Sequence, residues 1–407
     1  MNKKPQDFLT IDQQIELLKE RKLIINDEKL AKYILMTYDY YEVINGYKKN
    51  YVIKLDNHNE EFKPGVSFEQ IFSLFKFDKT LRQMIMIALV DLEEHMRSLI
   101  SYVIAKNYSS KHIRYLDSKN YINTKSKNPH WSKNEILKQL QYVIDDPKPP
   151  VNYHLKEYNN VPPWILLKQV YMSTLFNFVR ILKPDVKTEL IMLAYGVPKS
   201  IAERQEIKSL FMESLIFFLD YRNMAAHGKC MYSFIPKNTV SVGKKAIKEL
   251  KKENYDISGL QNTYGIAKLV NLLSLFNYKC PFNNVISVLN SSFSQHVMMY
   301  PNDIQHLTEA IGFNDDIELT NQNIKYKVSQ IIDANGNIDY EKYHELFPSS
   351  PIFSDSNAAA TLEYCNNQFI VKHNYRRSRK YNAKHNYRRS RKYNAKHYRK
   401  KRLHNKI

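Results

Sequence analysis

The strongest constraint on the fold of this chain is the segment 203–226, where apolar side chains recur at intervals of three and four residues. This spacing predicts an amphipathic α-helix with one buried stripe. The same period runs through residues 79–107. Two long helices of this kind indicate a helical bundle. The predicted buried stripe of segment 203–226 contains Ile207, Leu210, Phe211, Ser214, Leu215, Phe218, Tyr221 and Ala225.

Helix-start and helix-stop signals extend this pattern over most of the chain. Thr10 with Gln13 has the form of a capping box, and Asp27 and Asp78 stand where N-cap residues are expected. The chain has nine glycines, a scarcity that favours helices over turn-rich β architectures. We therefore expect an all-α fold, with further helices at 11–22, 28–45, 68–76, 134–144, 163–182, 261–293 and 302–311.

Composition and periodicity divide the chain into four parts. An N-terminal helical segment is expected at 1–66, and a helical domain at 67–235 contains both long stripes. Residues 236–348 are expected to form a helical extension. Residues 349–407 lose periodicity and are predicted to be a poorly ordered linker and basic tail.

The tail is a polycation built on a repeat. Residues 372–383 recur unchanged as 384–395, and residues 372–407 hold 16 of the 61 Lys and Arg residues and none of the 41 acidic residues. The rest of the chain is therefore close to neutral. A repeat without apolar periodicity is expected to be disordered without a partner and to bind RNA. The candidate contacts in the tail are Arg376, Arg377, Arg379, Arg388, Arg389 and Arg391.

The remaining patterns point to a cytoplasmic protein without cofactors. Cys230, Cys280 and Cys365 show neither a disulfide pattern nor metal-ligand spacing. No apolar run approaches the ~18 residues of a membrane span. Neither a phosphate-binding loop nor a dinucleotide fingerprint is present. The segment 333–337 resembles a calcium loop only superficially, since its Gly and its twelfth position do not fit. We expect no metal and no cofactor.

The candidate catalytic residues are Arg222, Asn223 and His227. A guanidinium grips phosphate with a rigid fork of donors, and an imidazole moves protons near neutral pH. Positions five apart point about 140° apart on an ideal helix, so Arg222 and His227 converge only if the helix relaxes near His227. Gly228 permits such an ending. Alternatively, Arg222 pairs with a carboxylate such as Asp220, and His227 caps its own helix.

Further segments of the chain resemble one bacterial family. The chain is similar to the abortive-infection (Abi) proteins of the AbiD/AbiF type, an anti-phage family with HEPN-type nuclease domains. The family pattern commonly has a Glu and then a Gly shortly after the Trp, where this chain has Lys168, Gln169 and Ser173, so that segment is given no role. The similar segments are 13–21, 40–47, 68–71, 77–82, 93–97, 163–164, 221–223 and 227–229.

The resemblance implies a HEPN-like helical bundle that cleaves RNA without a metal and dimerises to form one composite site. It implies that Arg222 and His227 are the catalytic pair, that Asn223 is the polar residue beside the Arg, and that a small structured RNA restrains a toxin. Glu93 and Arg97, one helical turn apart, are expected to support the site. An ordinary surface ion pair is the alternative for them.

A second RNA surface is predicted in residues 106–133, where basic groups alternate with aromatic ones. This mixture suits gripping a backbone and stacking bases, and a solvated loop is the alternative. The candidate contacts are Lys111, Arg114, Tyr115, Lys119, Lys125, Lys127 and Trp131.

Two other functions stay open at this point. One is a structured-RNA-binding protein whose Arg-His pair is not catalytic. The other is a HEPN toxin regulated by a nucleotidyltransferase antitoxin that modifies Tyr232 or a nearby residue. Cys230 is close to the motif, but the sequence offers no partner that would activate its thiol.

Overall fold

The computed structural model describes residues 8–54, 60–123, 128–237, 240, 243–252, 260 and 263–312, together with the backbone of two short strands at 318–321 and 324–327. The chain divides into two compact units, residues 1–343 and 344–407, and all statements below concern the first. The predictions for the six tail arginines, for Lys125 and Lys127, and for segment 333–337 lie outside the described residues.

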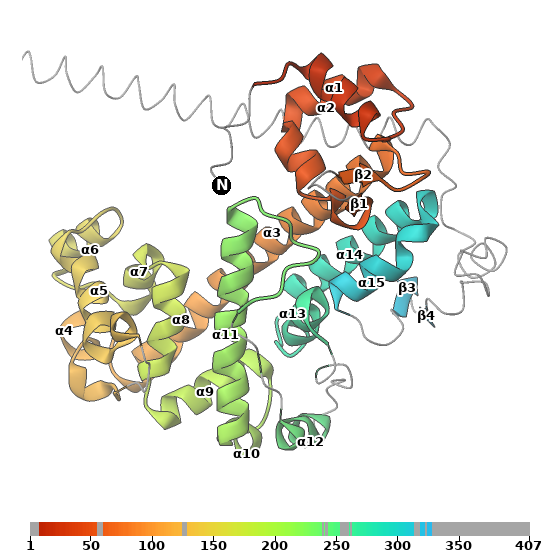
Figure 1. The fold of residues 1–407 in the computed structure, drawn as a ribbon. Helices are drawn as coiled ribbons and strands as arrows, with labels where there is room; N and C mark the ends of the chain where they lie inside the picture. Colours follow the sequence, from red (N-terminus) through yellow and green to blue (C-terminus); the bar gives the residue numbers. More distant parts are fainter. Residues whose placement is uncertain are drawn as a thin grey trace, which may run out of the picture. The chain divides into compact units, whose positions relative to one another are not determined.

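The all-α class is confirmed, since helices dominate the described residues and the strands form only two small antiparallel hairpins (Figure 1). None of the described helices combines the length and the apolar character that crossing a membrane requires. The strands are β1 Val52–Lys54, β2 Glu60–Phe62, β3 Glu318–Asn321 and β4 Ile324–Lys327. The main helices are α1 Ile11–Glu20, α2 Glu28–Tyr38, α3 Phe68–Asn107, α4 His112–Tyr115, α5 Lys133–Asp145, α6 Val151–Tyr158, α7 Pro163–Leu166, α8 Met172–Ile181, α9 Pro184–Tyr195, α10 Lys199–Ala202, α11 Gln205–Ala226, α12 Lys244–Lys252, α13 Gly265–Leu273, α14 Cys280–Met299 and α15 Ile304–Ile311. Short 3₁₀ or π turns are η1 Tyr41–Asn45, η2 Lys48–Asn50, η4 Ser118–Asn120, η5 Pro129–Trp131, η6 Leu167–Gln169 and η8 Pro301–Asp303.

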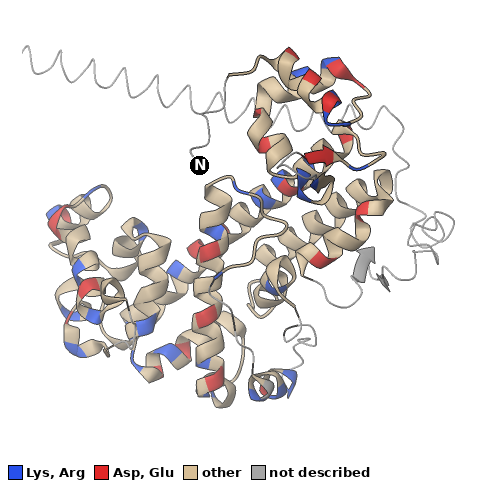
Figure 2. Ribbon diagram, viewed as in Figure 1, with Lys and Arg blue, Asp and Glu red and all other residues tan. Residues whose placement is uncertain are grey.

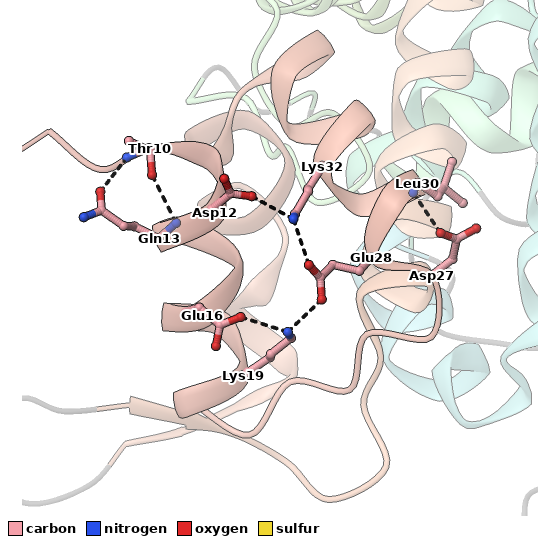
Figure 3. A network of polar contacts seen from close by, with 9 residues as sticks. All are labelled: Thr10, Asp12, Gln13, Glu16, Lys19, Asp27, Glu28, Leu30 and Lys32. Atoms are coloured by element: carbon pink, nitrogen blue, oxygen red, sulfur yellow. Dashed lines mark hydrogen bonds and ion pairs between the residues drawn. The ribbon is translucent and has the colours of Figure 1, made fainter.

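Helices α1 and α2 begin where their caps predict. Thr10 and Gln13 form the reciprocal capping box, and the Asp27 side chain accepts from the Leu30 N–H. Between the helices, Glu28 accepts from Lys19 and Lys32 at 2.8 Å each (Figure 3). These hydrogen bonds lower the pKa of Glu28 to about 2. Because the network is exposed, it contributes little to stability and chiefly orients the pair.

Helix α3 is a single 40-residue helix, so the predicted break into 68–76 and 79–107 is wrong. At ~1.5 Å per residue it is about 60 Å long. It contacts α7, α8, α9, α11 and α14 (Figure 1). Its apolar stripe is buried and forms the centre of the core. Asp78, predicted as the cap of the second helix, instead lies fully buried within α3. Its side chain bonds to a segment distant in sequence, described below.

Three other predicted helices are shorter or interrupted. Helix α2 ends at Tyr38 because Asp39 takes a left-handed φ of +60°. The predicted helix 163–182 is divided into α7, η6 and α8, and the predicted helix 261–293 is divided into α13 and α14.

The helices after residue 263 pack on α3 through a buried carboxylate. Asp303, 3% exposed, accepts from the Tyr51 hydroxyl at 2.7 Å and from Gln70 Nε2 at 3.0 Å. His296 Nε2 lies 2.9 Å from the same carboxylate, and His296 Nδ1 lies 2.9 Å from Ser73 Oγ. We name Asp303, its three partners Tyr51, Gln70 and His296, and Ser73 beyond His296 the Asp303 hub. The hub joins α14 and η8 to α3.

Candidate active site

Helix α11 carries the Arg-His motif at its C-terminal end. Its last residue is Ala226, and His227 follows as the C-cap with φ −85° and ψ 1°. Gly228 takes a left-handed φ of +72°, a conformation that costs a residue with a Cβ atom. The predicted end of the helix at His227 is therefore confirmed.

The polar groups of the motif are accessible. Asn223 and His227 are exposed, and Arg222 is half-buried. Arg222 Nη1 donates to Asn223 Oδ1 at 3.3 Å, while Arg222 Nε is buried without a hydrogen-bond partner among the described residues. The structure thus brings Arg222 and Asn223 together. Within the described part of the chain, Arg222 forms no ion pair with a carboxylate and no hydrogen bond with His227.

The segment after the motif is fixed to α3 by two side chains one helical turn apart. The buried carboxylate of Asp78 accepts from the backbone N–H groups of Met231, at 2.8 Å, and Tyr232. Arg82 donates to the carbonyl oxygens of Gly228 and Lys229. We name Asp78 and Arg82 the α3 clamp. The clamp sets the course of the chain directly after His227.

Burial governs the chemistry of the clamp. It raises the pKa of Asp78, because loss of hydration penalises the charged form more than the hydrogen bonds to Asp78 favour it. The Tyr47 hydroxyl donates to Asp78 at 2.7 Å, and burial with the nearby carboxylate raises the pKa of Tyr47 well above its usual range. Both groups therefore serve as fixed hydrogen-bond partners, held away from solvent.

Comparison with known proteins found one match. A family model described as "Abi-like protein" matches residues 33–233, a span that contains α3, the α3 clamp and the Arg-His motif. The match supports the Abi family. No similar curated protein and no similar solved structure was found.

Cys230 lies inside the Abi-like span but is not a nucleophile in this structure. Burial and the neighbouring Asp78 carboxylate raise the pKa of its thiol to about 12. The thiolate is the reactive form of cysteine, and very little of it is present at neutral pH. Sγ lies 3.6 Å from Ser233 Oγ, a contact that supplies no base.

Two buried tyrosines of the Abi-like span flank the motif in sequence. Tyr221 is fully buried, and its hydroxyl donates to the Phe234 carbonyl at 3.0 Å. Tyr232 is 4% exposed and stacks on Tyr47 with ring centroids 6.2 Å apart. A modifying enzyme that needs the Tyr232 hydroxyl would have to displace this segment from α3 first.

Glu93 and Arg97 form an i,i+4 pair, but they are largely buried rather than on the surface. Arg97 Nε donates to the Leu167 carbonyl at 2.7 Å, and Nη2 donates to the Val170 carbonyl at 3.3 Å. Arg97 thus satisfies the backbone groups at the interruption between α7 and α8. Its partners show a role in holding η6 on α3.

The predicted RNA surface at 106–133 is basic but less aromatic than the sequence suggests. Lys111, Arg114 and Lys119 are exposed, and Trp131 is half-buried. Tyr115 is 2% exposed, and its hydroxyl donates to the Val161 carbonyl at 2.7 Å. The Tyr115 ring belongs to the core, because burying it satisfies its hydroxyl as well as its apolar face, so it is not presented for stacking.

The sequence did not single out the clamp as part of the site. The sequence pattern predicts a helix cap at Asp78 and indicates no role for Arg82. The one available signal was their i,i+4 spacing inside a segment that resembles the family. Within the described residues, no group of three or more His, Cys, Asp or Glu side chains is arranged to hold a metal ion.

Proposed function

We propose that this chain is a cytoplasmic HEPN endoribonuclease of an abortive-infection defence system, active as a homodimer and restrained by a structured small RNA. The observation that carries the proposal is the half-buried Arg222 beside the exposed Asn223 and His227, at a helix end followed directly by the segment that the α3 clamp fixes. The match to the Abi-like family supports the defence role. RNA cleavage and control by RNA are the expectations that come from the resemblance.

The chemistry uses the nucleophile that RNA carries. A His227 imidazole accepts the proton of the 2′-hydroxyl while the 2′-oxygen attacks phosphorus. His227 of a second copy protonates the departing 5′-oxygen, which gives a 2′,3′-cyclic phosphate and a 5′-hydroxyl. Arg222 stabilises the charge on the phosphorane, and Asn223 orients Arg222 through the hydrogen bond between them.

The exposure of the motif supports a two-copy site. Arg222 and His227 make no hydrogen bond to each other in one chain, and both present polar atoms to solvent or leave them unpaired. A facing copy would bring a second imidazole and guanidinium to the same phosphate. The scheme requires no metal ion, because the substrate supplies the nucleophile.

A non-catalytic RNA-binding protein is the second candidate. The observation that favours it is that no hydrogen bond joins Arg222 to His227 among the described residues of one chain. Regulation by modification of Tyr232 is less favoured, because that ring is buried against Tyr47.

The test compares the wild type with Arg222→Ala and His227→Ala after expression in a bacterial host. We expect growth arrest and RNA fragments with 2′,3′-cyclic ends from the wild type, and a loss of cleavage of about 10²–10⁴-fold in both variants. Arg204→Ala and His154→Ala remove the same residue types elsewhere and should cleave as the wild type does.

The contrary result is equally specific. If the wild type, Arg222→Ala and His227→Ala all leave RNA intact while retaining the same bound RNA, the chain is a binding protein. Cleavage that persists in both variants would place the catalytic groups elsewhere.

A further inference from the structure

Three half-buried cationic side chains lie on α8, α9 and α11, where α11 packs against the other two helices. They are Arg180 at the end of α8, Lys187 in α9 and Lys208 in α11. Lys187 Nζ donates to the Arg180 carbonyl at 3.1 Å, which places the ammonium group at the junction of α8 and α9. Figure 2 shows Lys and Arg positions along these three helices.

All three side chains are half-buried, and within the described residues no carboxylate forms an ion pair with any of them. Burial, with repulsion from Lys208 and Arg180, lowers the pKa of Lys187 to about 8. Burial also lowers the pKa of Arg180. The charge of Asp185, the acidic residue in the first turn of α9, affects the pKa values of Tyr108 and Glu189. The three cations are therefore held together at a cost in free energy.

Local helix fields explain part of this arrangement. The carbonyl end of α8 attracts a cation, which accounts for the Lys187 hydrogen bond. Helix α9, however, begins with no side-chain cap, so its N-terminal field adds positive potential at the same junction. The carbonyl end of α8 therefore accounts for the position of Lys187, but it does not account for the presence of two further cations.

We propose that Arg180, Lys187 and Lys208 form a binding site for a phosphate group. A guanidinium offers two parallel donors that match two phosphate oxygens, and two ammonium groups supply the remaining donors and charge. A phosphate dianion or diester offsets part of the positive charge of the cluster and relieves the repulsion among its members.

The site is separate from the Arg-His motif. Lys208 and Arg222 are 14 residues apart in α11, about 21 Å along the helix axis at ~1.5 Å per residue. No side chain of the motif spans that distance. The inference therefore does not rest on RNA cleavage, and it stands or falls independently of the proposed nuclease.

The experiment measures thermal unfolding of the full chain in inorganic phosphate and in chloride at matched ionic strength. A ligand that binds only the folded state raises Tm with its concentration. We expect phosphate to raise Tm of the wild type, and Lys208→Met to weaken the phosphate affinity by about tenfold or more. In chloride, Lys208→Met should instead raise Tm, because it removes a repulsive charge.

The opposite effects in the two salts distinguish a binding site from a structural contact. Lys199→Met removes an exposed lysine of α10 outside the cluster and should behave as the wild type in both salts. Arg180→Met provides a second variant with the same expected loss of phosphate response. The basic tail is unchanged in all of them, so its own binding cancels. Equal phosphate responses in the wild type, Lys208→Met and Arg180→Met would overturn the proposal.

A second measurement identifies the source of the phosphate group. An RNA oligonucleotide without terminal phosphates is added to a His227→Ala protein, with and without Lys208→Met. If Lys208→Met weakens RNA binding and inorganic phosphate competes with the RNA, the group is a backbone phosphate. If RNA binding is unchanged while phosphate stabilisation is lost, the ligand is a small phosphate compound.

Discussion

The α3 clamp and the Asp303 hub each place one buried aspartate against α3, Asp78 within the helix itself and Asp303 in η8, and the two serve different ends. Asp78 and Asp303 are both buried, and each accepts a tyrosine hydroxyl at 2.7 Å. The other donors to Asp303 are side chains from α3 and α14, whereas the other donors to Asp78 are backbone N–H groups beside the motif. The hub joins helices to one another, and the clamp directs a loop.

The pKa values of the two carboxylates differ accordingly. Burial raises the pKa of Asp303, but the hydrogen bonds to it, that of His296 first, together bring it below its ordinary value. For Asp78, burial prevails over similar bonds, and the pKa is raised. The comparison teaches that Asp303 gains stability from its partners, while Asp78 is retained at a cost. Such a cost is common where a residue positions a functional group.

The largest expected effect is that of Asp303→Ala. It leaves Tyr51, Gln70 and His296 with buried polar atoms that lack a partner, and we expect the free energy of unfolding to fall by about 3–5 kcal/mol. Urea unfolding measures this. Asp91→Ala, at a half-buried position that bonds to a single tyrosine hydroxyl, should cost much less. Equal losses of unfolding free energy in the two variants would show that the Asp303 hub stabilises the fold no more than a single half-buried hydrogen bond does.

The next effect is that of Asp78→Ala, which leaves the Met231 and Tyr232 N–H groups unpaired. We expect a loss of about 2–3 kcal/mol in unfolding free energy, smaller than at Asp303 because the buried charge is itself unfavourable. RNA cleavage by the folded protein should fall as well, as His227 loses its fixed position. Asp78→Asn keeps an acceptor without the charge and should recover most of both.

A structural role alone would give a different result. Under that reading Asp78→Ala, assayed well below its Tm, would cleave RNA at the wild-type rate. Asp303→Ala is the matched control, since its hub has no bond to residues 227–232 among the described residues.

These contrasts also show what could be predicted from the sequence. The end of α11 was predictable, because Gly228 is a local signal that stops a helix beside the residue it exposes. The role of Asp78 was not, since an aspartate before an apolar run has the form of a cap and its true partners lie about 150 residues away. Tyr115 and Arg97 illustrate the same limit. Their residue types fit a surface role, and only long-range packing places them against Val161 and Leu167.

A smaller effect is expected for Gly228→Ala. An added Cβ meets no atom within 4 Å, so the change isolates the left-handed backbone at φ +72°. That strain costs about 1–2 kcal/mol, and the loop should shift to relieve it, which lowers cleavage. Gly243→Ala is the control, because it has equally open space and no left-handed φ. If both variants behave alike in stability and cleavage, the conformation of Gly228 does not position His227.

The smallest expected effect is a difference between the two carboxylates in how the unfolding free energy depends on pH. The folded pKa of Asp78 lies above its ordinary value of 3.8, so between the two values the folded state holds the proton more often, and unfolding free energy falls as pH rises. The folded pKa of Asp303 lies below 3.8, so the unfolding free energy rises with pH up to that value. Relative to the wild type, Asp78→Asn should therefore gain stability as pH increases above 3.8. Asp303→Asn should lose stability as pH approaches 3.8 from below. Urea unfolding across this range measures both differences, and two slopes of the same sign would remove the distinction between a carboxylate kept for position and one kept for stability.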